Sequence, residues 1–260
     1  MRLFKYKTIE ERRYVIMRAI VLGAGKGKRL LSEIHDLPKV LREANGKSLI
    51  EYVLDEISFI NQEDICIVAG YKKEKVLEKI KGNYKFAYQL EQLGTGHAVK
   101  MAKNCFDGYK GNVLIAYGDM PLFKRETFEN LINKHEESGA KCTVLTSIED
   151  RKLAYGRIIR NEQGEFGGVV EQKDCTEEQA KIKELNVGVY VFDSEYLFGC
   201  LDLLNNSNAQ KEYYLTDIPK IMLEKGERVN TFTLQNSDEI LGVNTPEELE
   251  ECERILKERA

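Results

Sequence analysis

The stretch AIVLGAGKGKR, residues 19–29, joins an uninterrupted apolar run to a glycine-rich turn that carries three cationic side chains. An apolar run without polar alternation is typical of a strand with both faces buried, as in a parallel sheet. Glycines that follow such a strand directly allow a sharp turn and a close approach of backbone N–H groups to a ligand. The stretch therefore predicts an α/β fold that opens with a central parallel strand.

The chain beyond this stretch alternates between apolar runs of strand length and amphipathic segments of helix length. Strands are expected at 19–22, 64–69, 84–88, 112–117 and 141–148, with helical faces at 49–60, 95–103 and 124–138. Later segments predict strands at 157–160, 167–172, 185–192 and 228–234, with a helix at 213–224. The hairpin-type turn 161–164 predicts a small antiparallel insertion in a mixed, mainly parallel sheet flanked by helices.

The final helix carries its own start signals. Thr245 can cap it, Pro246 suits its first position and Glu248 completes a capping box. Its expected apolar stripe consists of Leu249, Cys252 and Leu256. Residues 237–260 hold eight acidic and three basic side chains, which we interpret as a solvated helix face. Because no repeat and no Pro/Gly/Ser-rich linker interrupts the chain, one domain with an inserted lobe is expected.

Composition excludes several classes of protein. The 260 residues can bury a sizeable core, and 32% charged with 42% hydrophobic residues is an ordinary globular balance. The 39 Lys and Arg against 43 Asp and Glu give a net charge of -4, so general nucleic-acid or anionic-membrane binding is not expected. An anionic ligand would need a local concentration of cations.

The cysteines and the N-terminus indicate a cytoplasmic protein. The six cysteines show no metal-ligand or redox spacing, which favours reduced, structural thiols. Residues 1–17 are polar and lack an apolar signal core, and no apolar run is long enough to span a bilayer. We interpret them as an N-terminal extension, with an upstream start ahead of Met17 as the alternative that the sequence leaves open.

The glycine-rich turn belongs to a locally basic segment. Between Arg18 and Lys47 stand seven basic and three acidic side chains. Backbone N–H groups after a parallel strand, together with Lys and Arg, suit a polyphosphate, whereas the glycines alone would indicate only an ordinary βα turn. A dinucleotide fingerprint would need glycine at Lys28, and a Walker loop would need glycine at Leu41, so neither is supported.

A series of ordered segments gives the chain a specific resemblance. These segments are 22–29 (LGAGKGKR), 37–41 (LPKVL), 92–98 (QLGTGHA), 117–122 (YGDMPL), 155–158 (YGRI), 170–174 (VEQKD), 184–188 (ELNVG), 208–210 (NAQ), 212–217 (EYYLTD) and 242–244 (GVN). In this order they resemble the sugar-1-phosphate nucleotidyltransferases, specifically the uridylyltransferase half of the bacterial bifunctional N-acetylglucosamine-1-phosphate uridylyltransferase/glucosamine-1-phosphate acetyltransferases. The resemblance implies a Rossmann-like, GT-A-like nucleotidyltransferase domain over residues 18–260 with a small antiparallel sugar-binding lobe.

The resemblance implies Mg²⁺-dependent transfer of UMP from UTP to N-acetylglucosamine 1-phosphate, with release of pyrophosphate. Arg29 and Lys39 match the catalytic cations, and Asp119 and Asn244 match the metal ligands. Asp119 also follows an apolar strand directly, at the edge where open α/β sheets bind ligands. Carboxylate and amide oxygens suit Mg²⁺ and leave room for phosphates and water.

Further positions match the substrate-binding residues of this family. The nucleotide-binding matches are Leu22, Gly23, Ala24, Gly25, Gln89, Gly94, Thr95, Tyr117 and Gly118. The sugar-binding matches are Gly156, Glu171, Asn186, Tyr214 and Thr216, the last two with a buried structural role as an even alternative. The expected partners are therefore UTP and a sugar 1-phosphate, without nucleic acid or membrane; the sequence leaves the oligomeric state open.

Two departures from the family pattern bear on the substrate. Lys28 replaces a usual Thr beside the phosphates, and Val187 replaces a usual Thr at the sugar pocket. Uridylyl or thymidylyl transfer to another sugar 1-phosphate is therefore one alternative, and a non-catalytic sugar-nucleotide sensor is another. The sequence has no hexapeptide repeats, so the left-handed β-helix acetyltransferase domain of these relatives is not expected in it.

Overall fold

A computed structural model describes residues 17–30, 34–235 and 237–259. Its main sheet has the strand order β11-β7-β10-β6-β1-β4-β5. The strands are β1 (Arg18–Gly23), β4 (Ile65–Ala69), β5 (Lys85–Tyr88), β6 (Asn112–Tyr117), β7 (Cys142–Ile148), β10 (Glu184–Asp193) and β11 (Val229–Gln235). β1 pairs in parallel with both β4 and β6, while β10 is antiparallel to β6 and β7. The expected mixed, mainly parallel sheet is confirmed.

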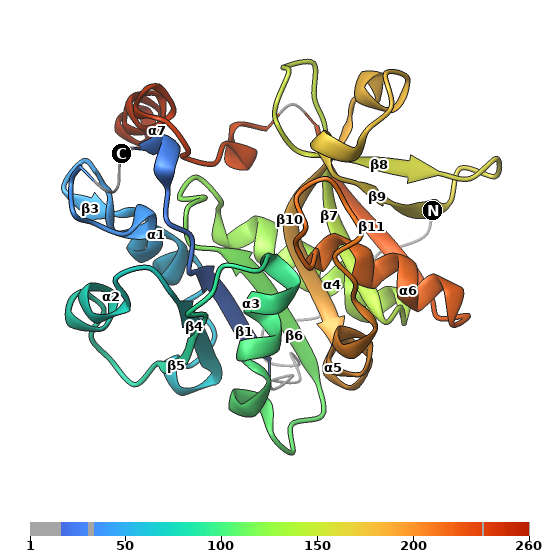
Figure 1. Ribbon diagram of the computed structural model, residues 1–260, viewed down its shortest axis with the longest axis horizontal. Helices are drawn as coiled ribbons and strands as arrows, with labels where there is room; N and C mark the ends of the chain where they lie inside the picture. The colour runs from blue at the N-terminus through green and yellow to red at the C-terminus, as the bar shows by residue number, and fades with distance from the viewer. Residues whose placement is uncertain (1–16, 31–33, 236, 260) are drawn as a thin grey trace, which may run out of the picture.

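Two hairpins complete the strands of the fold: one extends the main sheet, and the other forms a small sheet of its own. β8 (Gly156–Arg160) pairs antiparallel with β10 and with β9 (Phe166–Val170), which forms the inserted lobe predicted from the turn at 161–164. β2 (Glu43–Ala44) and β3 (Lys47–Ser48) form a separate two-stranded sheet. The lobe stands at one end of the main sheet, opposite the final helix, in Figure 1.

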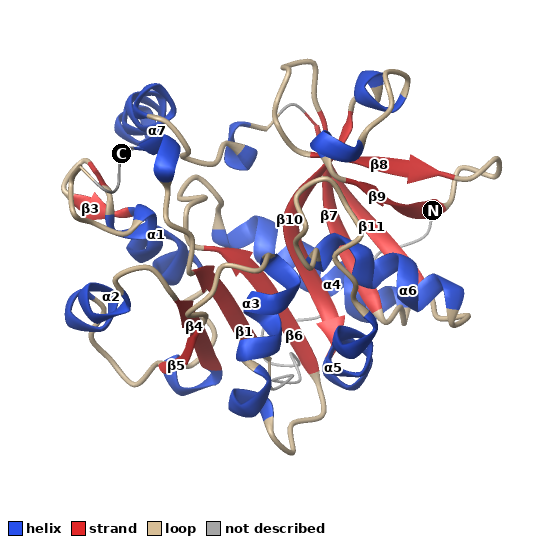
Figure 2. Ribbon diagram, in the orientation of Figure 1, coloured by secondary structure: helices blue, strands red, loops and turns tan. Residues whose placement is uncertain are grey.

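Helices cover both faces of the sheet, as Figure 2 shows. α1 (Leu49–Glu56), α2 (Lys73–Lys79) and α4 (Arg125–Ser138) pack over one core, and α3 (Thr95–Met101), α5 (Ser194–Cys200) and α6 (Ile218–Glu224) over the other. α7 (Pro246–Arg259) closes a third, smaller core with Leu30 and Leu49. None of the helices among the described residues has the length and apolarity that crossing a membrane requires.

Some elements differ from the sequence expectation for tertiary reasons. The helix expected at 213–224 begins at Ile218 after a 3-10 turn. Tyr213 instead pairs with residues at the start of α3, with its N–H donating to Leu93 and its carbonyl accepting from Gly96, both at 2.8 Å, and Tyr214 is extended. The strand expected to reach residue 172 ends at Val170. α2 and α5 were not predicted, since neither short segment has a clear amphipathic period.

The strand order creates a crevice. The chain passes from β1 to β4 on one side and later returns to β6 on the other, so the connections leaving β1 and β6 diverge. Open α/β sheets bind ligands at such a switch point, outside the carboxyl ends of the strands. The loop after Gly23 and the residue Asp119 both lie at this edge.

Candidate functional site

Two adjoining cavities occupy the crevice. The first, of about 360 Å³, is lined by the loop after β1, the segment after β5 and the end of β6. The second, of about 220 Å³, lies between the end of β6 and the inserted lobe. Both are lined by Thr95, Tyr117, Asp119, Glu212 and Asn244. A ligand in one cavity would therefore meet a ligand in the other beside Asp119.

The loop after β1 forms the wall of the first cavity. Leu22, Gly23, Ala24 and Gly25 line it through their position at the strand end. The loop packs closely on its neighbours, because a Cβ on Gly70 would stand 2.7 Å from the carbonyl oxygen of Ala24. A glycine-rich loop directly after a parallel strand is the kind of backbone that suits phosphate oxygens.

The cations at this wall come from two short helices. Lys28 and Arg29 lie in the 3-10 helix η2 (Lys28–Leu30), with exposed side chains that line the cavity. Lys39 begins the 3-10 helix η3 (Lys39–Leu41), and its side chain is only 11% exposed. A partly buried cation interacts with an anion in a medium of lower dielectric constant than water, so Lys39 can attract a phosphate more strongly than a fully exposed lysine.

Lys39, Asp119 and Asn244 converge where the two cavities meet. The Lys39 Nζ donates to Asn244 Oδ1 at 2.7 Å and forms an ion pair with Asp119 Oδ2. The three residues come from η3, from the turn after β6 and from the segment before α7. Although 205 residues separate Lys39 from Asn244, the fold places both oxygens on one cation.

The start of α7 positions Asn244. The carboxylate of Glu248 accepts from the backbone N–H groups of Asn244 at 2.6 Å and Thr245 at 3.1 Å, while the Thr245 hydroxyl accepts from the Glu248 N–H at 3.3 Å. This is the capping box predicted from the sequence. The backbone of Val243 also donates to the Asp119 carbonyl at 3.0 Å, which ties the segment to the end of β6.

Tyr155 fixes the same segment from the lobe side. Its hydroxyl donates to the Ile240 carbonyl at 2.6 Å and accepts from the Gly242 N–H at 3.0 Å. Burial raises the pKa of Tyr155 above its ordinary value, so the phenol stays protonated and keeps donating. Residue type alone did not mark Tyr155, although it lies within one of the segments that carry the family resemblance.

The oxygens of Asp119 and Asn244 fit a divalent metal ion. One carboxylate and one amide oxygen are hard donors, and Mg²⁺ takes few protein ligands because it keeps waters and phosphate oxygens. Both oxygens already point at one positive charge, the Lys39 ammonium. The described residues hold no cluster of three or more His, Cys, Asp or Glu side chains suited to a metal.

Gln89 and Gly94 form the far end of the first cavity. The Gln89 side chain is 4% exposed, and its Nε2 donates to the Gly94 carbonyl at 2.8 Å. Gly94 has φ +108°, and a Cβ there would stand 2.5 Å from the Tyr213 carbonyl oxygen, so only glycine fits. The pocket end is therefore a fixed arrangement of amide and backbone groups that can read the edge of a planar base.

The second cavity is lined by polar groups from β10 and from the segment that follows β9. Asn186 Oδ1 accepts from the Tyr190 hydroxyl at 3.0 Å and from the Gly188 N–H at 3.4 Å, which leaves its amide N–H groups for a ligand. Thr216 donates to Glu171 Oε1 at 2.9 Å. Burial, followed by the charges of Asp217 and neighbouring carboxylates, raises the pKa of Glu171. The cavity thus offers donors and acceptors suited to hydroxyl groups.

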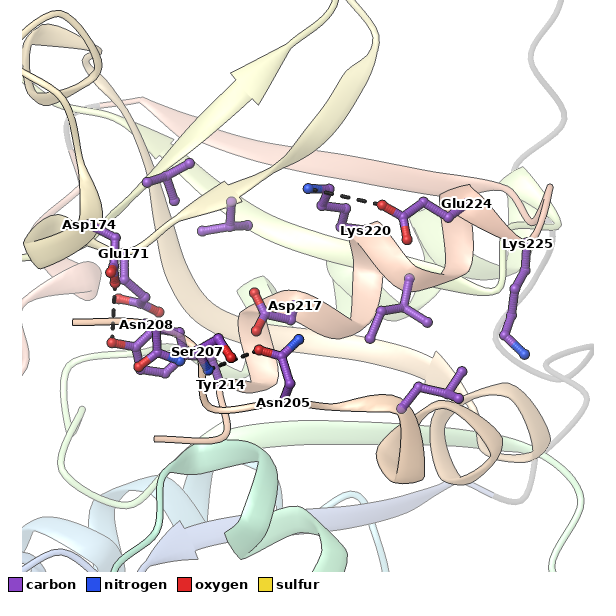
Figure 3. Close-up of a pocket in the computed structure, with 14 residues that line it drawn as sticks. Glu171, Asp174, Asn205, Ser207, Asn208, Tyr214, Asp217, Lys220, Glu224 and Lys225 are labelled. Atoms are coloured by element: carbon purple, nitrogen blue, oxygen red, sulfur yellow. Dashed lines mark hydrogen bonds and ion pairs between the residues drawn. The ribbon is translucent and has the colours of Figure 1, made fainter. Parts of the chain in front are cut away.

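A third cavity of about 560 Å³ lies behind the sugar-side wall. It shares Glu171 and Tyr214 with the second cavity, and Figure 3 shows these two with Asp174 at one end and Lys220, Glu224 and Lys225 at the other. The Tyr214 hydroxyl donates to Asp174 at 3.2 Å and accepts from Gln210 at 3.0 Å. Tyr214 therefore separates the two spaces as part of a hydrogen-bonded wall.

The structure brings the residues predicted from the sequence together, with two behind the cavity walls. Gly118 donates to the Leu22 carbonyl at 2.9 Å and packs near Val40, and Thr216 reaches the site through Glu171. The first cavity is lined by Leu22, Gly23, Ala24, Gly25, Arg29, Lys39, Gln89, Gly94, Thr95, Tyr117, Asp119 and Asn244. The second includes Gly156, Glu171, Asn186 and Tyr214. Gln92 and Glu212 line cavities without having been predicted, because nothing in their residue types distinguishes them from surface residues.

Comparisons with known proteins agree with this arrangement. The sequence pattern of the nucleotidyl transferase family matches residues 18–257. The bifunctional protein GlmU of Streptococcus thermophilus (strain CNRZ 1066) is 45% identical over 241 residues, and that of Oceanobacillus iheyensis is 40% identical over the same length. Each alignment covers 93% of this chain and 52% of the relative, so the chain spans about half the length of the curated relatives it matches.

A solved structure has the same fold at low identity. The putative glucose-1-phosphate thymidylyltransferase from Bacillus anthracis, solved in complex with a sucrose, aligns with a TM-score of 0.72 and 17% identity. The alignment covers 92% of this chain and 94% of that one. The fold class expected from the motifs is confirmed by this match.

Proposed function

Because the chain belongs to the nucleotidyl transferase family, we propose that it transfers UMP from UTP to N-acetylglucosamine 1-phosphate and releases pyrophosphate. The observation that carries the proposal is the meeting of Lys39, Asp119 and Asn244 at the junction of two cavities. The first cavity has the size and backbone for a nucleotide, and the second has the polar lining for a sugar. Identity of 40–45% to the bifunctional proteins GlmU supports the same assignment.

The reaction needs alignment and charge neutralisation from this chain. The phosphate of a sugar 1-phosphate is an anion that can attack the α-phosphorus without a general base, but it must approach a second anion. Lys39 and Arg29 lower that repulsion, and the loop after β1 holds the triphosphate in line. Mg²⁺ bound to Asp119 and Asn244 would add positive charge between the phosphates.

The same chemistry on a different sugar phosphate, or with dTTP, is the second candidate. Val187 lines the sugar cavity, is 2% exposed and has no hydroxyl to offer. A pocket that lacks one donor discriminates less strongly between sugars that differ by a polar group. A third possibility, a sugar-nucleotide sensor without turnover, retains the cavities but predicts no pyrophosphate release.

A substrate panel separates these candidates. Pyrophosphate release is measured with Mg²⁺ for each pairing of UTP, dTTP, CTP or ATP with N-acetylglucosamine 1-phosphate, glucose 1-phosphate or glucosamine 1-phosphate. The proposal expects the highest kcat/KM with UTP and N-acetylglucosamine 1-phosphate. Preference for glucose 1-phosphate would overturn the acetamido assignment, and UTP binding without turnover on any sugar phosphate would favour the sensor.

A further inference from the structure

The orientation of the Gln89 amide is fixed by two acceptors. Its Nε2 lies 2.8 Å from the Gly94 carbonyl oxygen and 3.1 Å from Nδ1 of His97. A carbonyl oxygen only accepts hydrogen bonds, so the amide group that faces Gly94 must be the NH₂. Both of its hydrogens then have acceptors, and the amide oxygen is the group left to face a ligand in the first cavity.

This arrangement requires one protonation state of His97. Nδ1 accepts a hydrogen from Gln89 only when it carries no proton, so the ring is neutral with its hydrogen on Nε2. Burial and then the Lys100 ammonium lower the pKa of His97, against the opposing charge of Glu91.

The charged groups around His97 come from three segments. Lys100 lies one turn along α3, and Glu91 lies in the segment before α3. Asp202, in the 3-10 helix η8 (Leu201–Leu203), forms an ion pair with Lys100 at 2.8 Å and lines a further cavity together with His97. Lys100 therefore has its own partner and leaves the ring free to hydrogen-bond with Gln89.

We propose that His97 is a positioning residue for base selection, which turns the Gln89 amide so that its oxygen faces the nucleobase. This inference rests on the uridylyl transfer proposed above. An acceptor oxygen suits the N3–H of uracil or thymine, whereas cytosine presents an acceptor nitrogen at the same place. Selection thus arises from a repulsive contact with the wrong base as well as from a hydrogen bond with the right one.

The test compares two substitutions of His97. His97→Phe keeps a planar ring but offers no acceptor, so the amide is held only by Gly94 and can turn. We expect its ratio of kcat/KM for UTP over CTP to fall about fivefold to tenfold, the value of one hydrogen bond. In His97→Asn the side-chain oxygen can take the place of Nδ1, and the ratio should stay close to that of the wild-type protein. Thermal unfolding of each variant verifies that it folds.

A pH series separates positioning from packing. Between about pH 7.5 and about pH 5 the wild-type ratio should decline as His97 gains a proton and stops accepting, whereas the His97→Phe ratio should not follow that decline. Equal losses for UTP and CTP in His97→Phe would overturn the inference. If the wild-type protein transfers no nucleotide, the proposed function fails. The role of His97 is then tested by calorimetry, as the ratio of the binding affinity for UTP to that for CTP. Equal ratios in wild-type and His97→Phe protein overturn that role.

Discussion

At the scale of single residues, the Lys39 ammonium holds the two oxygens that are proposed above to bind the metal ion. Asp119 and Asn244 both contact it, and Asp119 is 20% exposed at its side chain. Replacing one of these oxygens removes a ligand for a divalent ion and also leaves a largely buried ammonium without its ion-pair partner. Leaving a buried charge unpaired is costly, so effects on activity and on stability must be measured separately.

Asp119→Ala should reduce Mg²⁺-dependent pyrophosphate release by at least about 100-fold, because a hard-cation site with two protein ligands loses its only carboxylate. The measurement is initial rate against Mg²⁺ concentration, with thermal unfolding as the check on folding. Asp150→Ala is the matched control, since Asp150 pairs with Lys183 on the surface. Near-normal turnover in Asp119→Ala would refute the metal assignment.

Two cysteines that the sequence separates by 39 residues lie in contact. Cys66 in β4 and Cys105 in the 3-10 helix η5 (Lys103–Phe106) place their sulfurs 2.9 Å apart. The hydrogen bond from Cys66, aided by Lys85 and Arg18, lowers the pKa of Cys105 to about 7. The sequence predicted isolated structural thiols, and no spacing rule could have shown this pair.

Cys105 should therefore be the first thiol alkylated by iodoacetamide, since the thiolate is the reactive form and a lowered pKa increases the fraction of thiolate at a given pH. Cys175, which is equally half-buried but has its pKa raised by burial, is the internal comparison. Peptide mass spectrometry over a pH series gives both rates. In Cys66→Ala the midpoint for Cys105 should move upward, and an unchanged midpoint would contradict the proposed cause.

At the scale of elements, local signals predicted an element well where its own residues decide it. The start of α7 is an example, because Thr245, Pro246 and Glu248 supply the cap, the first-turn residue and the capping box within four positions. The start of α6 is the opposite case. The backbone of Tyr213 hydrogen-bonds with Leu93 and Gly96, partners about 120 residues away, and helical periodicity carries no information about them.

Glu248→Ala tests whether the cap of α7 also serves the site. Removing the carboxylate deletes two charge-assisted hydrogen bonds at a helix N-terminus, which should lower the free energy of unfolding by about 1 kcal/mol. Because one of those bonds holds Asn244, the Mg²⁺ concentration for half-maximal rate should rise as well. Glu250→Ala, on the exposed side of the same helix, is the control and should change neither quantity appreciably. A stability loss without any change in Mg²⁺ dependence would confine the cap to a structural role.

At the scale of the whole molecule, the sequence predicted the sheet and the family but not the junction of the cavities. The strands β1, β4 and β6 each contain an uninterrupted buried apolar run, so their parallel pairing was foreseeable. The wall between the second cavity and the larger third cavity was not foreseeable, since Tyr214, Asp174 and Gln210 meet only through the fold. Segment order predicted residues that line the two cavities, and only the structure shows which of them touch.

One buried histidine should contribute measurably to the pH dependence of the free energy of unfolding. His135 is 3% exposed, lies 3.0 Å from the Thr143 hydroxyl through Nδ1, and burial lowers its pKa to about 4. Between about pH 6.5 and about pH 4 the unfolded chain binds a proton here that the folded protein does not. The free energy of unfolding therefore decreases as the pH is lowered through this range, by up to about 3 kcal/mol. The raised pKa of Glu171 acts in the opposite direction, because a buried carboxyl favours the folded state as it becomes protonated.

Urea unfolding at about pH 7.5 and about pH 5 should therefore be compared between wild-type protein and His135→Gln, a difference in which the carboxyl contributions cancel. The wild-type protein should lose more stability on acidification than the variant, and parallel losses would show that His135 already carries its proton in the folded state.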